Sequence, residues 1–147
     1  MDPILLSVPQ LAAYQPALAA LIILCLAVLT QGFLAGVLGL AGGEQVAGMP
    51  LKGDHGLRSF RILRTYGNST ENLPVMLATT GLAIIAGVSA ALVNWLVILH
   101  VGIRLAYWAI YYSGVGKVGG GLRTISYVGA FMMNVMLAFA TAFWLLF

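Results

Sequence analysis

The sequence predicts an all-α integral membrane protein, folded as one four-transmembrane-helix bundle over residues 1–147. The first observation is composition: 61% of the residues are hydrophobic and only 7% are charged, whereas soluble domains carry about 25% charged residues. The second is that the apolar residues form four long runs, each near the roughly 20 residues that a helix needs to cross a bilayer. The third is that the seven Lys and Arg residues gather in two stretches.

The four expected spans are residues 16–40, 60–88, 91–114 and 122–147. The first carries no charge, and the second begins polar and becomes apolar after Pro74. The connection between the second and third is so short, around Ser89 and Ala90, that these two spans form an antiparallel hairpin. The other two connections are rich in glycine, which is typical of loops.

The distribution of basic residues predicts the orientation. They open the second span or surround the connection between the third and fourth: Lys52, Arg58, Arg61, Arg64, Arg104, Lys117 and Arg123. Positively charged connections remain on the cytoplasmic side of a membrane. We therefore expect a multi-pass protein of an inner (cytoplasmic) membrane or an endomembrane, with both termini on the opposite side.

Each of the last three spans carries one polar stripe. The residues that share a face within roughly 60°, at about 100° per residue, are Arg64, Asn68 and Glu71; then His100, Arg104, Tyr107 and Tyr111; then Arg123, Tyr127 and Asn134, with Thr124 beside them. A charge at membrane depth costs about 3 kcal/mol or more unless it faces protein or water. We expect the stripes to face a common cavity near the cytoplasmic side, where Glu71 faces several arginines.

Such a cavity has an excess of positive charge, which predicts an anionic ligand with carboxylates, because arginine binds carboxylates in bidentate fashion. The alternative is that the charges are structural ion pairs or interfacial side chains; we favour that for Lys52 and Arg58 and leave Arg61 open. The charges are too few and too divided for a nucleic-acid surface. The chain has a single cysteine, Cys25, and no second His or carboxylate completes a metal site with His100, so we expect no metal site. We expect His100 to be an interior histidine.

The stripes carry motifs at fixed spacing. The second span reads Arg64-TYG-Asn68-ST-Glu71-NL-Pro74, the third Arg104-LA-Tyr107-WAI-Tyr111, and the fourth opens Arg123-Thr124-IS-Tyr127. With these residues the sequence resembles the MAPEG family, the membrane-associated proteins of eicosanoid and glutathione metabolism. The resemblance implies a homotrimer that binds glutathione at its subunit interfaces, near the cytoplasmic side.

The resemblance also implies roles for individual residues. Arg123, with Thr124 beside it, would contact the sulfur and stabilise the thiolate. The residues that would bind the rest of glutathione are Arg64, Asn68, Glu71, Arg104, Tyr107, Tyr111 and Tyr127. The thiolate would attack a lipophilic electrophile or hydroperoxide that arrives through the membrane lipid, so the expected activity is that of a glutathione transferase or peroxidase.

Two departures from the family pattern keep a second hypothesis open. The end of the first span, VLGLAGGEQ, lacks the arginines that several eicosanoid-type members carry, and the loop GVGKVGGG before Arg123 is long. Eicosanoid specificity is therefore not expected. The alternative to an enzyme is a non-catalytic membrane scaffold or partner subunit. A channel ranks third, because the outer half of each span is apolar.

Overall fold

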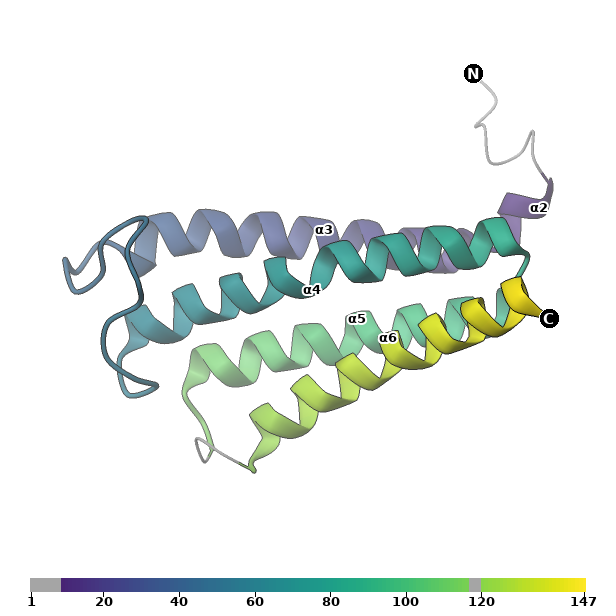
Figure 1. Ribbon diagram of the computed structural model, residues 1–147. Coiled ribbons are helices and arrows are strands. Elements are labelled where there is room, and N and C mark those ends of the chain that lie inside the picture. The colour runs from purple at the N-terminus through teal and green to yellow at the C-terminus, as the bar shows by residue number, and fades with distance from the viewer. Residues whose placement is uncertain (1–8, 117–119) are drawn as a thin grey trace, which may run out of the picture.

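The computed structural model describes residues 9–116 and 120–147, which form a bundle of four long antiparallel helices (Figure 1). The helices are α3 (Gln15–Leu34), α4 (Arg58–Ala86), α5 (Ala90–Ser113) and α6 (Leu122–Leu146). A short helix, α2 (Pro9–Ala12), precedes α3, and a π-helical turn, η1 (Ala35–Gly39), continues it. No strand occurs in the described ranges, so the predicted all-α bundle is confirmed. Lys117 and residues 1–8 lie outside them.

Three of the helices are long and apolar enough to cross a membrane: Gln15–Gly39, Ala90–Ser113 and Leu122–Leu146. The second predicted span, α4, has 29 residues, which is ample length at about 1.5 Å per residue. The first half of α4 is so polar that the helix is not apolar enough to be counted with the other three. That polar half is the part that carries Arg64, Asn68 and Glu71.

Glycines in the left-handed conformation end two of the helices. Gly87 (φ 78°) ends α4, and Gly114 (φ 71°) ends α5. Glycine is favoured at such a helix end because it has no Cβ to clash in the left-handed conformation. After Gly87 only Val88 and Ser89 precede α5, which produces the predicted tight hairpin between α4 and α5.

The interior of the bundle is apolar at the end away from the polar stripes. Met76, Ala83, Val93, Val97 and Leu137 are fully buried there. On the outside, large apolar side chains stay exposed on every long helix, for example Leu29, Ile85, Trp95 and Phe139. Exposed apolar surface on this scale is suited to contact with lipid or with another membrane helix.

The polar halves of α4, α5 and α6 meet at the other end of the bundle. There α4 begins, α5 ends and α6 begins, and the loop from residue 40 to residue 57 lies over the start of α4 (Figure 1). The antiparallel order therefore brings residues from three distant parts of the sequence to one end. His100 lies deeper, buried, with Nδ1 2.9 Å from the carbonyl oxygen of Ala130, as expected of an interior histidine.

Candidate functional site

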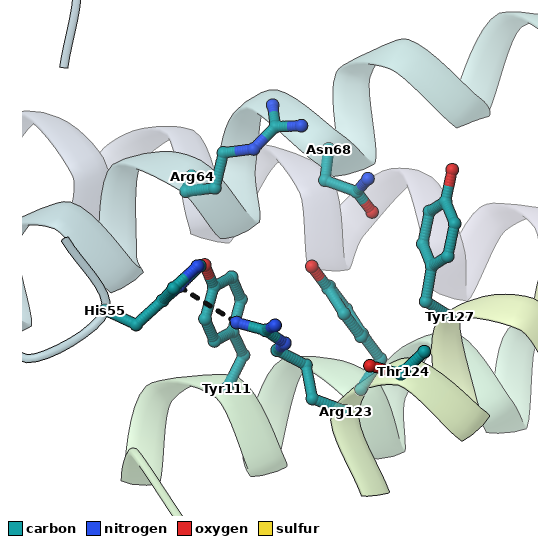
Figure 2. A pocket seen from close by; sticks show the side chains of 8 residues that line it. His55, Arg64, Asn68, Tyr111, Arg123, Thr124 and Tyr127 are labelled. Carbon is teal, nitrogen blue, oxygen red and sulfur yellow. Dashed lines mark hydrogen bonds between the residues drawn. The ribbon is translucent and has the colours of Figure 1, made fainter. Parts of the chain in front are cut away.

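A polar cavity of about 330 Å³ opens between α4, α5, α6 and the loop that precedes α4. Figure 2 shows its side chains converging from these four segments. The lining residues are His55 from the loop, Arg64 and Asn68 from α4, Tyr107 and Tyr111 from α5, and Arg123, Thr124 and Tyr127 from α6. All the predicted site residues except Glu71 and Arg104 are among them.

Helical spacing explains why each helix contributes as it does. Arg64 and Asn68 are four residues apart on α4, as are Tyr107 and Tyr111 on α5, so each pair lies one turn apart on a single face. The rings of Tyr107 and Tyr111 lie 5.6 Å apart, and that of Tyr127 lies 6.3 Å from Tyr107. Three tyrosine rings thus form a continuous aromatic wall.

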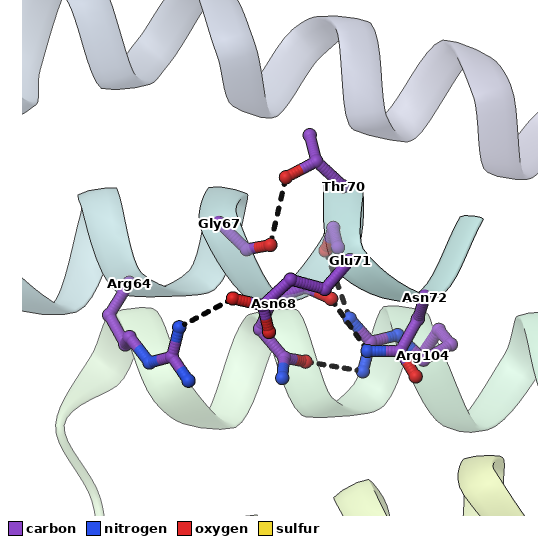
Figure 3. Close-up of polar contacts among 8 residues, drawn as sticks. Arg64, Gly67, Asn68, Thr70, Glu71, Asn72 and Arg104 are labelled. Atoms are coloured by element: carbon purple, nitrogen blue, oxygen red, sulfur yellow. Dashed lines mark hydrogen bonds and ion pairs between the residues drawn. The ribbon is translucent and has the colours of Figure 1, made fainter. Parts of the chain in front are cut away.

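Arg104 stands behind this wall and outside the cavity. Its side chain is only 4% exposed. Nη1 donates to Asn68 Oδ1 at 2.7 Å (Figure 3). Nη2 donates to Ser69 Oγ at 3.0 Å. The guanidinium also lies 4.8 Å from the centre of the Tyr107 ring. Sequence analysis missed Ser69 because a serine on a polar helix half gives no distinct signal.

Glu71 corrects the expectation of an acid facing several arginines. In the described part of the chain it forms one ion pair, in which its Oε1 lies 3.1 Å from Nη1 of Arg64 (Figure 3). The side chain of Glu71 is 58% exposed and that of Arg64 is 43% exposed. It lies two turns from Arg64 on the outer side of α4. Arg104 donates to an amide and a hydroxyl and Arg123 contacts a loop residue, so neither is hydrogen-bonded to the carboxylate.

Arg123 is held by a residue that sequence analysis did not select, His55. Nη1 of Arg123 lies 2.9 Å from His55 Nδ1, and the hydroxyl of Tyr111 contacts the same nitrogen (Figure 2). The guanidinium also stacks 5.0 Å from the centre of the Tyr111 ring. The available signal was modest: His55 is one of two histidines in the chain and lies three residues before the arginine-rich start of α4.

The loop backbone at His55 is fixed by Arg61. Nη1 of Arg61 donates to the carbonyl oxygens of His55 and Gly56, both at 2.9 Å. Asp54 Oδ1 accepts from the N–H of Gly56 at 2.7 Å, and Gln45 exchanges two hydrogen bonds with the backbone of Lys52, at 2.7 and 2.9 Å. Arg61, left open by the sequence, therefore positions the loop.

The environment of His55 disfavours its protonated form. Burial lowers the pKa of its imidazole below the usual 6.5, Arg123 lowers it further, Arg64 and Arg61 contribute in the same direction, and Asp54 opposes them. The hydrogen bond agrees: arginine has no acceptor atom, so Nδ1 must accept from Arg123 with its lone pair. A neutral imidazole that accepts at Nδ1 carries its proton on Nε2.

The cavity therefore has the electrostatic character of an anion site. Two guanidinium groups, Arg64 and Arg123, line it together with three tyrosines, an amide and a hydroxyl, and no carboxylate is among its described lining residues. Arginine forks and tyrosine hydroxyls are suited to carboxylates. Within the described ranges no group of three His, Cys, Asp or Glu side chains is placed to hold a metal ion.

The decisive comparison is with protein-family models. The model of the MAPEG family matches residues 12–143, nearly the whole chain. The chain belongs to the MAPEG family. Searches of curated proteins and of solved structures gave no match.

Family membership makes this MAPEG protein a multi-pass integral membrane protein and supports a general role in membrane glutathione or eicosanoid metabolism. The match includes all of α3, α4 and α5 and most of α6. The cavity lies wholly within the matched range. The MAPEG helices therefore carry both the apolar surface for the membrane and the cationic cavity at one end of it.

Proposed function

We propose that this MAPEG protein binds glutathione in the cavity between α4, α5 and α6, stabilises its thiolate, and transfers it to a lipophilic electrophile or uses it to reduce a lipophilic hydroperoxide. The observation that carries the proposal is the pair Arg64 and Arg123, which face one cavity with no acid among its described lining residues. Glutathione, with two carboxylates, one ammonium and a thiol, matches this charge.

Arg123 is the proposed group for the sulfur, with Thr124 beside it. A free thiol has a pKa of about 8.5 and is only a few per cent ionised at neutral pH. Lowering that pKa by about two units requires roughly 2.7 kcal/mol of preferential stabilisation of the anion. A guanidinium in a water-poor site can supply this amount, since charge interactions strengthen as the effective dielectric constant falls.

The remaining residues divide the rest of the ligand among them. Arg64, with Tyr107, Tyr111 and Tyr127, offers cationic and hydroxyl donors to the carboxylates. Asn68, already accepting from Arg104, keeps its amide N–H groups for the peptide backbone, and Arg104 acts by fixing Asn68. Glu71 binds the ammonium group of glutathione, since its carboxylate is exposed and therefore accessible to the ligand.

The chemistry needs no nucleophile from the protein. When the thiolate attacks an electrophilic carbon, a C–S bond forms and the leaving group departs, or the electrons of the attacked double bond take up a proton. With a hydroperoxide, sulfur takes the terminal oxygen, the O–O bond breaks, and the alkoxide that leaves takes up a proton from water to become an alcohol. The resulting sulfenic acid condenses with a second glutathione to the disulfide and water.

The assembly and the sidedness belong to the same proposal. We infer a homotrimer in which the exposed face of α4, with Arg64 and Glu71, lies against a neighbouring subunit, so that glutathione in the cavity also contacts that neighbour. The site lies on the cytoplasmic side and the termini on the opposite side. The lipophilic substrate reaches the sulfur from the membrane lipid, past the apolar side chains that α3, α5 and α6 expose.

The test is a titration of the detergent-purified protein with glutathione at neutral pH, followed by the ultraviolet absorbance of the thiolate. Saturable absorbance supports the proposal and turns attention to the electrophile. Its absence in a protein shown to be folded would remove glutathione activation from this site.

A second function, a non-catalytic membrane scaffold, is favoured by two observations. The guanidinium of Arg123 already has a partner, His55, and the end of the first span, with η1, carries no basic residue to add a carboxylate contact. A scaffold would co-purify in a fixed larger complex and bind no glutathione. These two results together would replace the catalytic proposal.

A further inference from the structure

His55 lines the cavity beside the guanidinium of Arg123. Its Nδ1 contacts both Arg123 Nη1, at 2.9 Å, and the hydroxyl of Tyr111. The same three side chains also line a second, adjoining cavity of about 230 Å³. The contact among these three side chains therefore lies between the two cavities. A molecule that binds at Arg123 must touch this contact or displace it.

The proposed reaction leaves one proton without a destination. Glutathione arrives as a thiol and is used as a thiolate, so its proton must go to a base or to water. An acceptor has to lie within hydrogen-bond reach of the donor, or one water molecule away. In the described cavity no carboxylate lines the wall, the guanidinium groups cannot accept, and His55 has the lone pair nearest to Arg123.

The charge balance around His55 reverses when an anion binds. Three nearby cations act on its imidazole, Arg61 and Arg64 from α4 and Arg123 from α6. Tyr111 contacts it from α5, and Asp54 is its acidic neighbour in the loop. Burial and this excess of positive charge both lower the pKa of the imidazole. An anionic sulfur at Arg123 cancels part of this positive charge and thereby favours protonation of the neighbouring imidazole.

We propose that His55 accepts the thiol proton, so that glutathione binding transfers this proton from sulfur to Nδ1 and leaves a thiolate beside Arg123. The inference rests on the proposed function and adds a catalytic residue to it. In the balanced step the S–H bond breaks, its electron pair stays on sulfur, and the N–H bond forms on the lone pair of Nδ1. No electron is transferred and no further reactant is required.

The two partners of Nδ1 are suited to this exchange in different ways. Tyr111 has a hydroxyl that can donate to a neutral Nδ1 and accept from a protonated one. Arg123 can only donate, so protonation of Nδ1 ends its bond to His55 and turns the guanidinium towards the sulfur. A single proton transfer therefore forms the N–H bond on His55 and also frees Arg123 to stabilise the thiolate.

The loop is built to hold the imidazole in place during the exchange. Arg61 binds the backbone carbonyls of His55 and Gly56 rather than the imidazole, so a change of charge on the ring does not break the anchor. The ring packs edge-on against Phe60, with centroids 5.1 Å apart. The imidazole therefore keeps its position whether or not Nδ1 is protonated.

The experiment measures protons released for each thiolate formed when glutathione is mixed with the protein in weakly buffered detergent near neutral pH. A pH indicator reports the protons and ultraviolet absorbance reports the thiolate. For the wild type we expect the ratio to be clearly below one, because His55 retains part of the proton. His55→Asn is the matched variant: its amide oxygen can replace Nδ1 as acceptor for Arg123 but takes up no proton, so its ratio should be one.

Glutathione sulfonate supplies a second probe, since its sulfur group is a permanent anion. Its binding should draw protons from solution into the wild type and none into His55→Asn. A wild-type ratio of one, with no proton uptake on sulfonate binding, would overturn the role of His55 while leaving glutathione activation intact. Failure of both ligands to bind a folded wild type would instead overturn the proposed function, and this inference with it.

Discussion

Arg104 donates from Nη1 to Asn68 Oδ1 at 2.7 Å, across the interface between α5 and α4. The arginine that family resemblance assigns to the ligand is therefore a buried support for Asn68, a proposed ligand residue. Its second nitrogen, Nη2, bonds to Ser69, so the fork holds two neighbouring residues of α4. This arrangement makes the orientation of Asn68 depend on the shape of the guanidinium.

Arg104→Lys should therefore weaken both folding and glutathione binding. A single ammonium cannot reproduce two donors at the fork's separation, and a buried acceptor that loses its donor costs about 1–3 kcal/mol. We expect a lower midpoint of thermal unfolding in detergent and a weaker glutathione titration. Arg58→Lys, an exposed arginine at the start of α4, is the control and should change neither.

Arg123→Ala should remove thiolate formation without unfolding the protein. The pKa of bound glutathione would return towards about 8.5, and the pH at which thiolate absorbance reaches half its maximum would rise by about two units. Arg123 is only partly buried, so the fold does not depend on it. An unchanged midpoint in a variant that still binds glutathione would assign the sulfur to another residue.

Glu71→Gln should affect the ligand far more than the fold. Its ion pair with Arg64 is exposed, and exposed pairs contribute at most about 1 kcal/mol. A hydrogen bond to a charged ligand group is worth about 1.5–3 kcal/mol, so affinity for glutathione should fall about tenfold or more. An analogue without the amino group should bind wild type and variant equally; an equal loss for both ligands would contradict the assigned contact.

The lowered pKa of His55 predicts how stability depends on pH. Because the folded protein holds a proton on His55 less readily than the unfolded chain, the unfolded state binds more protons between the folded pKa and 6.5. Stability should therefore rise with pH through that window and level off above about pH 6.5. Unfolding midpoints of the wild type across this range, compared with those of His55→Asn, measure the effect. In the variant this component should vanish.

Gly114→Ala should loosen the loop from a distance. Gly114 has φ 71°, and a Cβ there would lie 3.0 Å from Cζ of Arg61, the residue that anchors His55. A non-glycine residue in this conformation costs about 1–2 kcal/mol, and displacement of Arg61 adds to it. We expect a lower unfolding midpoint and weaker thiolate formation.

Gly102→Ala is the matched control for that change. It lies within α5, and a Cβ there meets nothing within 4 Å. Alanine is favoured over glycine in a helix interior by about 1 kcal/mol, so this variant should be as stable as the wild type or more so. A loss of thiolate in Gly102→Ala equal to that in Gly114→Ala would point to a general effect on α5 rather than to Arg61.

Much of the site could be predicted because helical periodicity is local. Arg64 and Asn68 repeat at four residues, as do Tyr107 and Tyr111, so each pair shares a face wherever its helix lies. The cost of charge at membrane depth then turns these faces inward. The same argument failed for Glu71 because a stripe of roughly 60° does not tell which residue at its edge faces the cavity and which faces outward.

The sequence by itself determined four long helices, their antiparallel order and the polar faces of three of them, because apolar composition and a 3.6-residue period act within each segment. Only the tertiary structure decided the partners. The fork of Arg104 meets Asn68 and Ser69, and a loop without any period carries His55 onto Arg123. Those contacts join residues 35 to 68 positions apart, and they depend on how helices pack and where a loop is anchored, which no local pattern encodes.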